Sequence, residues 1–151
     1  MRPSFYSAGI GSFETICLAA GLGIAVGMFS GTSGLEGSAR GRMTLLSAVI
    51  GLAVGYFAAV IFDGSTLGSM LFCALFAGFS CAVVSGVIAG ATRRGGTGAL
   101  GFITILVALI IAVASIIVPP IAIVPAIALV WLAISRGRRS DRKHAGLRIL
   151  R

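Results

Sequence analysis

Residues 95–135 read GGTGALGFITILVALIIAVASIIVPPIAIVPAIALVWLAIS, a stretch of 41 residues without a charged side chain. A helix crosses the hydrocarbon core of a bilayer with about 20 apolar residues, so this stretch is roughly twice too long for a single crossing. Pro119 and Pro120 stand beyond its middle, and the interior of a helix tolerates proline poorly. The stretch therefore predicts two membrane spans joined by a turn at the two prolines.

The composition of the whole chain agrees with this prediction. Of 151 residues, 58% are hydrophobic and 11% are charged, and the mean hydropathy is +1.09. In soluble globular domains about a quarter of the residues are charged. The length leaves room for one bundle of four or five helices and none for an appended catalytic domain. We therefore expect an all-α fold, a polytopic transmembrane helical bundle.

The hydrophobic runs between charged residues mark the individual spans. They predict five crossings, at residues 13–30, 43–62, 67–91, 99–118 and 121–135. The last run is short for a full crossing, so a bundle of four spans with an incomplete, proline-broken hairpin at 99–135 stays open as an alternative. Residues 1–135 form the predicted transmembrane bundle, and residues 136–151 form a basic cytoplasmic tail.

The basic residues predict the orientation. Seven of the twelve lie in the tail, and the linkers after the first and third spans carry two arginines each. With five spans, every basic residue except Arg2 falls on one side, which the positive-inside rule makes cytoplasmic. The N-terminus is then outside. A cleaved signal peptide is the less favoured alternative, because no A-x-A-like site follows Phe29. Eleven arginines against one lysine fit a GC-rich bacterial genome. The plasma membrane of a bacterium is therefore the expected location.

The basic tail and the tryptophan shortly before it predict contact with lipid. Trp131 lies about one turn before the tail, at the usual depth of an aromatic anchor. Each Lys or Arg near an anionic leaflet contributes about 1 kcal/mol to binding. The predicted headgroup-binding residues are Arg136, Arg138, Arg139, Arg142 and Lys143. Nucleic-acid binding is not expected, because the positive charge is not spread over a soluble surface.

Small residues recur at four-residue spacing within the first three spans. Helices in lipid associate through close backbone approach, which small residues permit. The predicted packing residues are Gly23, Gly27, Gly51, Gly55, Gly78, Gly86 and Gly90. A pore lining is the alternative interpretation. The segments GIAVGMF at 23–29 and GLAVGYF at 51–57 also resemble each other, either by chance or through the inverted duplication found in transporters.

The spans carry little that points to chemistry. No ionisable side chain lies at mid-depth, where such residues mark transport paths and proton relays. Glu14 and Asp63 are predicted at the same outer interface, either as an acidic mouth or, respectively, at a helix N-terminus and in an Asp-Gly turn. We predict no catalytic, cofactor-binding or metal-binding residue, and no enzymatic activity. The three cysteines, Cys17, Cys73 and Cys81, are expected to be packing residues.

The second half of the chain has a recognisable order of parts. A small-residue span is followed by the linker Gly96-Thr-Gly98, by a long apolar hairpin broken at Pro119, Pro120 and Pro125, and by an Arg-rich tail. In this order residues 78–143 resemble uncharacterised small multi-pass bacterial inner-membrane proteins that carry a domain of unknown function. The resemblance implies a location in the membrane and implies no activity.

Two hypotheses for the function follow. The first is an accessory or scaffolding subunit of a membrane assembly, which requires a membrane-protein partner; a homo-oligomer is the alternative to such a partner. The second is a small channel or transporter for a neutral or cationic solute, and a holin-like pore former is a weaker third. A channel requires the hydroxyls of Tyr56, Ser80 and Thr104 to converge on one cavity, whereas a scaffold leaves them bonded locally.

Overall fold

The computed structural model describes the backbone of residues 6–33, 38–62, 65–92 and 99–147, and the side chains of residues 13–33, 38–62, 65–92 and 99–135. Within these ranges the chain forms five α-helices and one short 3₁₀ helix. Their bounds are α1 Tyr6–Gly31, α2 Ser38–Ile61, α3 Thr66–Thr92, α4 Ala99–Ile117, η1 Pro119–Ala122 and α5 Ile123–Leu147. The fold is the all-α helical bundle that the sequence predicted.

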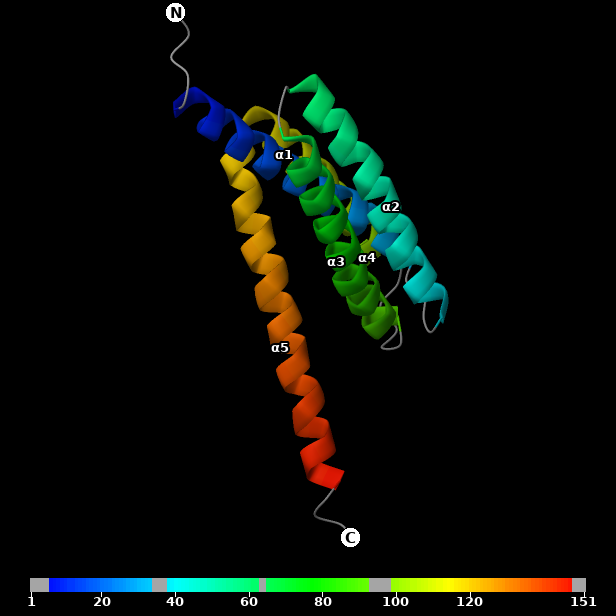
Figure 1. Ribbon diagram of the computed structural model, residues 1–151. Coiled ribbons are helices and arrows are strands. Elements are labelled where there is room, and N and C mark those ends of the chain that lie inside the picture. Colours follow the sequence, from blue (N-terminus) through cyan, green and yellow to red (C-terminus); the bar gives the residue numbers. More distant parts are fainter. Residues whose placement is uncertain (1–5, 34–37, 63–64, 93–98, 148–151) are drawn as a thin grey trace, which may run out of the picture.

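Successive helices run in opposite directions, so the bundle has two ends (Figure 1). We use the term upper end for the end at which α1, α3 and α5 begin and α2 and α4 finish. The lower end holds the starts of α2 and α4, and α5 runs past it. Short connections between antiparallel helices produce this arrangement. The first and last helices consequently point their free ends in opposite directions.

Four of the helices contain a segment long and apolar enough to cross a membrane. These segments are Phe13–Gly31, Ser38–Ile61, Thr66–Thr92 and Ala99–Ile117. Each has close to the 20 residues or more that one crossing requires. The protein is therefore a multi-pass membrane protein. A fifth, shorter apolar stretch covers Pro119–Ser135.

Helix α5 departs from the predicted boundary between bundle and tail. The sequence placed the end of the last span at Ser135, but the helix continues without a break to Leu147. Five of the twelve residues from Arg136 to Leu147 are Arg or Lys, which are good helix formers. The last apolar stretch and most of the basic segment thus form one rod, which leaves the bundle at its lower end (Figure 1).

The two prolines shape the turn between α4 and α5. Val118 has φ −137° and ψ 87°, outside the helical region. A residue before proline is disfavoured in that region, because the proline ring clashes with its backbone. Pro119 and Pro120 then begin η1, and the Ile121 N–H donates to the Val118 carbonyl at 3.0 Å. The chain reverses direction within these few residues.

Helices α1 and α3 form the centre of the bundle. Helix α3 packs most extensively against α1 and α2, while α4 packs mainly on α1, and α5 makes only small contacts with α1, α3 and η1. The buried share of each span agrees with this arrangement, because 56% of the α3 span is buried within the chain but only 11% of the α4 span. The outer face of α4 is therefore available to lipid or to another protein.

Candidate functional site

Helix α1 lies directly on α3 along its predicted glycine stripe. A Cβ added to Gly23 would overlap the Cys73 carbonyl, and one added to Gly27 would overlap the Ser80 hydroxyl and the Ala77 carbonyl. All three contacts are with backbone atoms or with a fully buried side chain, which cannot move aside easily. This seam requires glycine at both positions.

Helix α2 approaches α3 from another side in the same manner. A Cβ added to Gly51 would lie 2.8 Å from the Ala77 Cβ and 2.9 Å from the Cys73 carbonyl oxygen. One added to Gly55 would lie 2.6 Å from the Ser69 carbonyl oxygen. The two seams therefore share the middle of α3.

The two seams run in opposite directions along α3. From Gly23 to Gly27 the contacts of α1 move from Cys73 to Ala77, whereas from Gly51 to Gly55 the contacts of α2 move back toward Ser69. The similar segments 23–29 and 51–57 thus press the same part of α3 from two sides. This shared contact supplies a physical reason for the glycine at the same two positions of each segment.

The remaining predicted glycines lie on α3 itself, and of these Gly78 is less tightly packed than the glycines of α1 and α2. A Cβ added to Gly78 would sit 3.6 Å from the Ala48 Cβ, an ordinary contact. Gly86 is buried and Gly90 is partly buried. The closest approaches on α3 fall instead on a neighbouring row, which the prediction did not select. That row consists of Ser69, Cys73, Ala77 and Ser80.

Two buried hydroxyls join the helices across these seams. The Ser80 hydroxyl donates to the Ile24 carbonyl of α1 at 3.1 Å, and to the Ala77 carbonyl at 3.3 Å. The Ser47 hydroxyl of α2 also donates to the Ala77 carbonyl, at 3.1 Å. Hydrogen bonds of this kind connect helices within membranes. Each hydroxyl is used by protein backbone rather than left facing a cavity.

The other two hydroxyls of the channel hypothesis lie elsewhere. Thr104 donates to the Leu100 carbonyl one turn back on α4, at 2.7 Å. Tyr56 is 48% exposed on α2, a helix that does not pack against α4. Tyr56, Ser80 and Thr104 therefore stand on three helices and do not converge on one cavity.

Arg40 has a structural contact that the sequence did not reveal. Its partly buried guanidinium donates to the Ala82 carbonyl of α3 near the lower end of the bundle. Two turns further along α2, Ser47 donates to the Ala77 carbonyl of α3, while the Thr44 hydroxyl between them donates to the Arg40 carbonyl of its own helix at 2.9 Å. The sequence pattern had used Arg40 only as a marker of the cytoplasmic side. Arg40 and Ser47 in fact both join α2 to the backbone of α3.

The predicted acidic mouth is only partly within the described residues. Glu14 is exposed, and it lies in the third turn of α1 rather than at the helix N-terminus, because α1 begins at Tyr6. Asp63 lies outside the described residues. Within the described ranges, no group of three or more His, Cys, Asp or Glu side chains gathers in a way that would hold a metal ion.

The predicted lipid-anchoring residues lie along α5. Trp131 is 69% exposed. The backbone of the basic residues continues the same helix, while their side chains lie outside the described set, which holds for Arg136, Arg138, Arg139, Arg142 and Lys143. The three cysteines are free thiols, and all of them are buried in the bundle.

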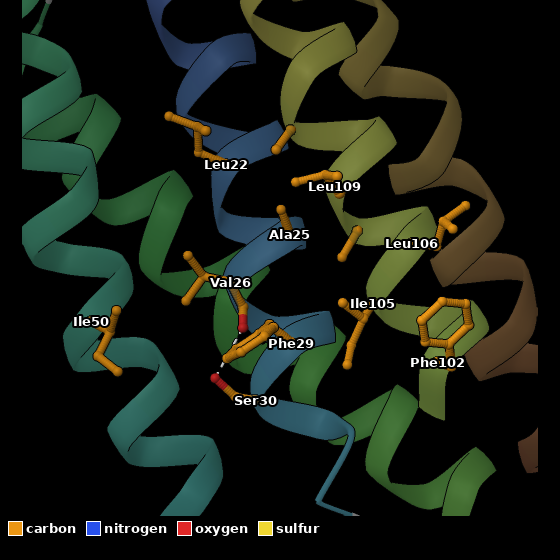
Figure 2. Close-up of a pocket in the computed structure, with 12 residues that line it drawn as sticks. Leu22, Ala25, Val26, Phe29, Ser30, Ile50, Phe102, Ile105, Leu106 and Leu109 are labelled. Carbon is orange, nitrogen blue, oxygen red and sulfur yellow. Dashed lines mark hydrogen bonds between the residues drawn. The ribbon is translucent and has the colours of Figure 1, made fainter. Parts of the chain in front are cut away.

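Two apolar grooves open on the outside of the bundle. The first, which we call the α1–α4 groove, has a volume of about 590 Å³ and lies between α1 and α4, with Ile50 of α2 at its edge (Figure 2). The second, of about 520 Å³, is formed by α1, α3 and α5, with Phe72 and Phe76 in its wall. Ser30 is the one hydroxyl residue of the first groove, and it donates to the Val26 carbonyl at 2.9 Å.

The comparisons with known proteins add nothing to these observations. No protein-family model, no curated protein and no solved structure matches the chain. The candidate site is therefore defined by the residues of this chain alone: the seams around α3 and the grooves outside them.

Proposed function

We propose that this protein is a non-enzymatic accessory or scaffolding subunit of a larger membrane assembly. The observation that carries the proposal is the separation of the hydroxyls of Tyr56, Ser80 and Thr104. Ser80 bonds the backbone of α1, and Thr104 bonds its own helix. A solute path needs polar groups that face a common space, so their local use favours a structural role.

The distribution of tight and open surfaces also supports this role. The centre of the bundle is closed by the two glycine seams on α3. By contrast, large apolar side chains cover the face of α4 outside the groove, including Ile103 at 55% exposure and Ile110 at 57%. A rigid core with a broad apolar exterior suits a subunit that presents its helices to a neighbouring membrane protein.

The proposed setting is the plasma membrane of a bacterium, with the N-terminus outside and the C-terminus in the cytoplasm. Arg40 and Arg42 begin α2 at the lower end, and the basic part of α5 leaves the bundle at that same end. Positive charge concentrated at one end favours that end as the cytoplasmic one. The lower end would then meet the anionic headgroups of the inner leaflet.

Mild-detergent extraction followed by native mass spectrometry tests the proposed role. The protein, tagged at its N-terminus, is extracted from the membranes in which it is naturally made, and an unrelated tagged multi-pass protein serves as the control. Recovery of further membrane proteins in fixed stoichiometry, absent from the control, is the expected result. A lone monomer or a homo-oligomer would overturn the proposal and direct the work to solute flux in liposomes.

A further inference from the structure

We propose that the α1–α4 groove binds one acyl chain of an anionic phospholipid of the lower leaflet, whose headgroup rests at Arg42. The inference concerns a lipid site and does not depend on the proposed scaffolding role. It follows from the shape of the groove, from its length, from the closure of its upper end and from the charge at its lower end.

The groove is kept open by small side chains on its facing walls. Ala25 of α1 and Ala108 of α4 are among its lining residues, and larger side chains such as Phe29 and Phe102 line it toward its lower end (Figure 2). Its lining is apolar, and its volume of about 590 Å³ lies within the range of ligand-binding clefts. A flexible hydrocarbon chain suits a space of this form.

The length of the groove matches one leaflet. On α1 the lining runs from Leu22 to Ser30, and on α4 from Phe102 to Ala112. At 1.5 Å per residue these segments are about 12 and 15 Å long. The hydrocarbon of a single leaflet is about 15 Å deep, half of the full core. The groove therefore has the depth of one acyl chain.

The upper end of the groove is closed. A Cβ added to Gly21 would overlap the Ser115 side chain and would lie 3.1 Å from the Ala122 Cβ. Both Ser115 and Ala122 are buried. Helix α1 thus touches α4 and η1 directly above the groove, and the two helices leave space between them only below this contact. A lipid chain would extend upward from the lower end and stop at Gly21.

An exposed arginine stands at the open end. Arg42, Leu46 and Ile50 are spaced by four residues and share one stripe of α2, and Ile50 forms the edge of the groove. Arg42 therefore lies about 12 Å below that edge. It is exposed, whereas the neighbouring Arg40 is engaged with the Ala82 carbonyl. A guanidinium matches the geometry of a phosphate oxygen pair.

Lipid retention measured by native mass spectrometry tests this site. The purified protein is placed in nanodiscs of equimolar phosphatidylglycerol and phosphatidylcholine with identical acyl chains, and the lipids that remain bound after ejection are counted. We expect one retained phosphatidylglycerol. Ala25→Phe fills the groove and should reduce this retention at least tenfold. Ala53→Phe adds the same ring at an exposed position of α2 outside the lining and should leave retention unchanged.

The headgroup contact is tested separately. Arg42→Gln should reduce the preference for phosphatidylglycerol over phosphatidylcholine about fivefold, the effect of one basic residue near a phosphate. Arg2→Gln makes the same charge change in the N-terminal segment, which the sequence predicts on the opposite side of the membrane, and should leave the preference unchanged. Equal effects of the two charge variants would show that the preference follows the overall charge rather than Arg42, and would overturn the site.

Folding is checked so that the groove variant stays interpretable. Ala25→Phe and a second groove variant, Ala112→Phe, are compared with the unmodified protein by size-exclusion profile and thermal stability in the same detergent. Retention of the lipid at its original level in either folded groove variant would overturn the proposal. Loss in both, with Ala53→Phe unaffected, would support it.

Discussion

The carbonyl of Cys73 is a point at which three helices meet. Gly23 of α1 and Gly51 of α2 both place their backbones against it, with no room for a methyl group at either position. Lipid tails are as apolar as the side chains, so burial alone supplies little drive for helices to associate in a membrane. The contact distances that glycine permits therefore carry an unusually large share of the packing.

The first prediction compares two glycines that lie within helices. Gly27→Ala drives a methyl group into the Ser80 hydroxyl and the Ala77 carbonyl. Overpacking of this kind costs about 1–3 kcal/mol, and we expect the free energy of unfolding to fall by that amount. Gly101→Ala, on α4, meets nothing within 4 Å. This control should be neutral or stabilising by up to about 1 kcal/mol, because alanine is the better helix former.

Unfolding by increasing sodium dodecyl sulfate in mild-detergent micelles, followed by circular dichroism, measures both variants. Equal stability of Gly27→Ala and the unmodified protein would mean that α1 does not lie on α3 in this register. A large loss in Gly101→Ala would mean that a packed neighbour covers that part of α4.

The second prediction concerns two buried serines on opposite sides of the α2–α3 seam. Ser47 donates to the Ala77 carbonyl, while the Ser69 hydroxyl is buried with no hydrogen-bond partner among the described residues. Hydrogen bonds between helices in membranes contribute about 0.6 kcal/mol on average, so Ser47→Ala should cost roughly that amount. Ser69→Ala removes an unsatisfied group and should be neutral or stabilising by up to about 1 kcal/mol.

The same unfolding titration distinguishes the two serine variants. Destabilisation by Ser69→Ala as large as that by Ser47→Ala would show that the Ser69 hydroxyl has a partner, such as a bound water. The comparison is well matched, since both residues have 0% exposure and both changes remove a single oxygen atom.

At the residue scale, the sequence predicted part of the site. Four-residue spacing predicted Gly23, Gly27, Gly51 and Gly55, and the structure places all four against α3. On α3 the spacing argument selected the row through Gly78, but the tightest contacts lie on the row through Cys73 and Ala77. Helix α3 packs on two sides and has small residues on more than one face. Periodicity cannot rank faces that are equally small.

At the scale of elements, the charges and prolines predicted where most helices lie. The predicted span 67–91 corresponds to α3 Thr66–Thr92, and the predicted span 99–118 to α4 Ala99–Ile117. Two helices extend beyond the predicted spans. Helix α1 begins before the hydrophobic run, at Tyr6, and α5 continues past Ser135 to Leu147. Hydropathy identifies the part of a helix that lies in lipid, but it does not identify the helical turns on either side of that part.

The third prediction tests the contact that positions α4 on α1. A methyl group at Gly21 would overlap both the Oγ and the Cβ of Ser115, so Gly21→Ala should cost about 1–3 kcal/mol of stability. Ser115→Gly removes both atoms and should restore much of that loss when it is combined with Gly21→Ala. Residues in direct contact show coupling energies of about 0.5–3 kcal/mol. We expect a coupling in the upper part of this range.

A double-mutant cycle of the four proteins, each unfolded by the same titration, measures the coupling. The cost of Ser115→Gly alone, which includes the lost local bond to the Ile111 carbonyl and the poorer helix propensity of glycine, is subtracted by the cycle. Simple additivity of the two changes would show that Gly21 and Ser115 are not in contact, and the closed upper end of the α1–α4 groove would then be wrong.

At the scale of the whole molecule, the direction of each helix is set by the helix before it. Five antiparallel helices place the start of α1 and the end of α5 at opposite ends of the bundle (Figure 1). Four of them are long enough to span a bilayer, and the shorter Pro119–Ser135 stretch decides whether the two ends lie on opposite sides of the membrane. A short apolar stretch crosses only where the bilayer thins or the flanking residues snorkel.

The last prediction follows from this geometry and is read out by reporters fused at successive points of the chain in a bacterial host. Alkaline phosphatase requires disulfides, which form outside the cytoplasm, whereas green fluorescent protein matures inside. Fusion after Val118, at the upper end, should give an active phosphatase. Fusion after Thr92, at the lower end, or after Arg151, the last residue of the sequence, should give a fluorescent protein and an inactive phosphatase. The same reporter active at both Val118 and Arg151 would mean that α5 does not cross the membrane. A reversed pattern at all three points would place the arginine-rich end outside, against the tendency that positive charge imposes on membrane insertion.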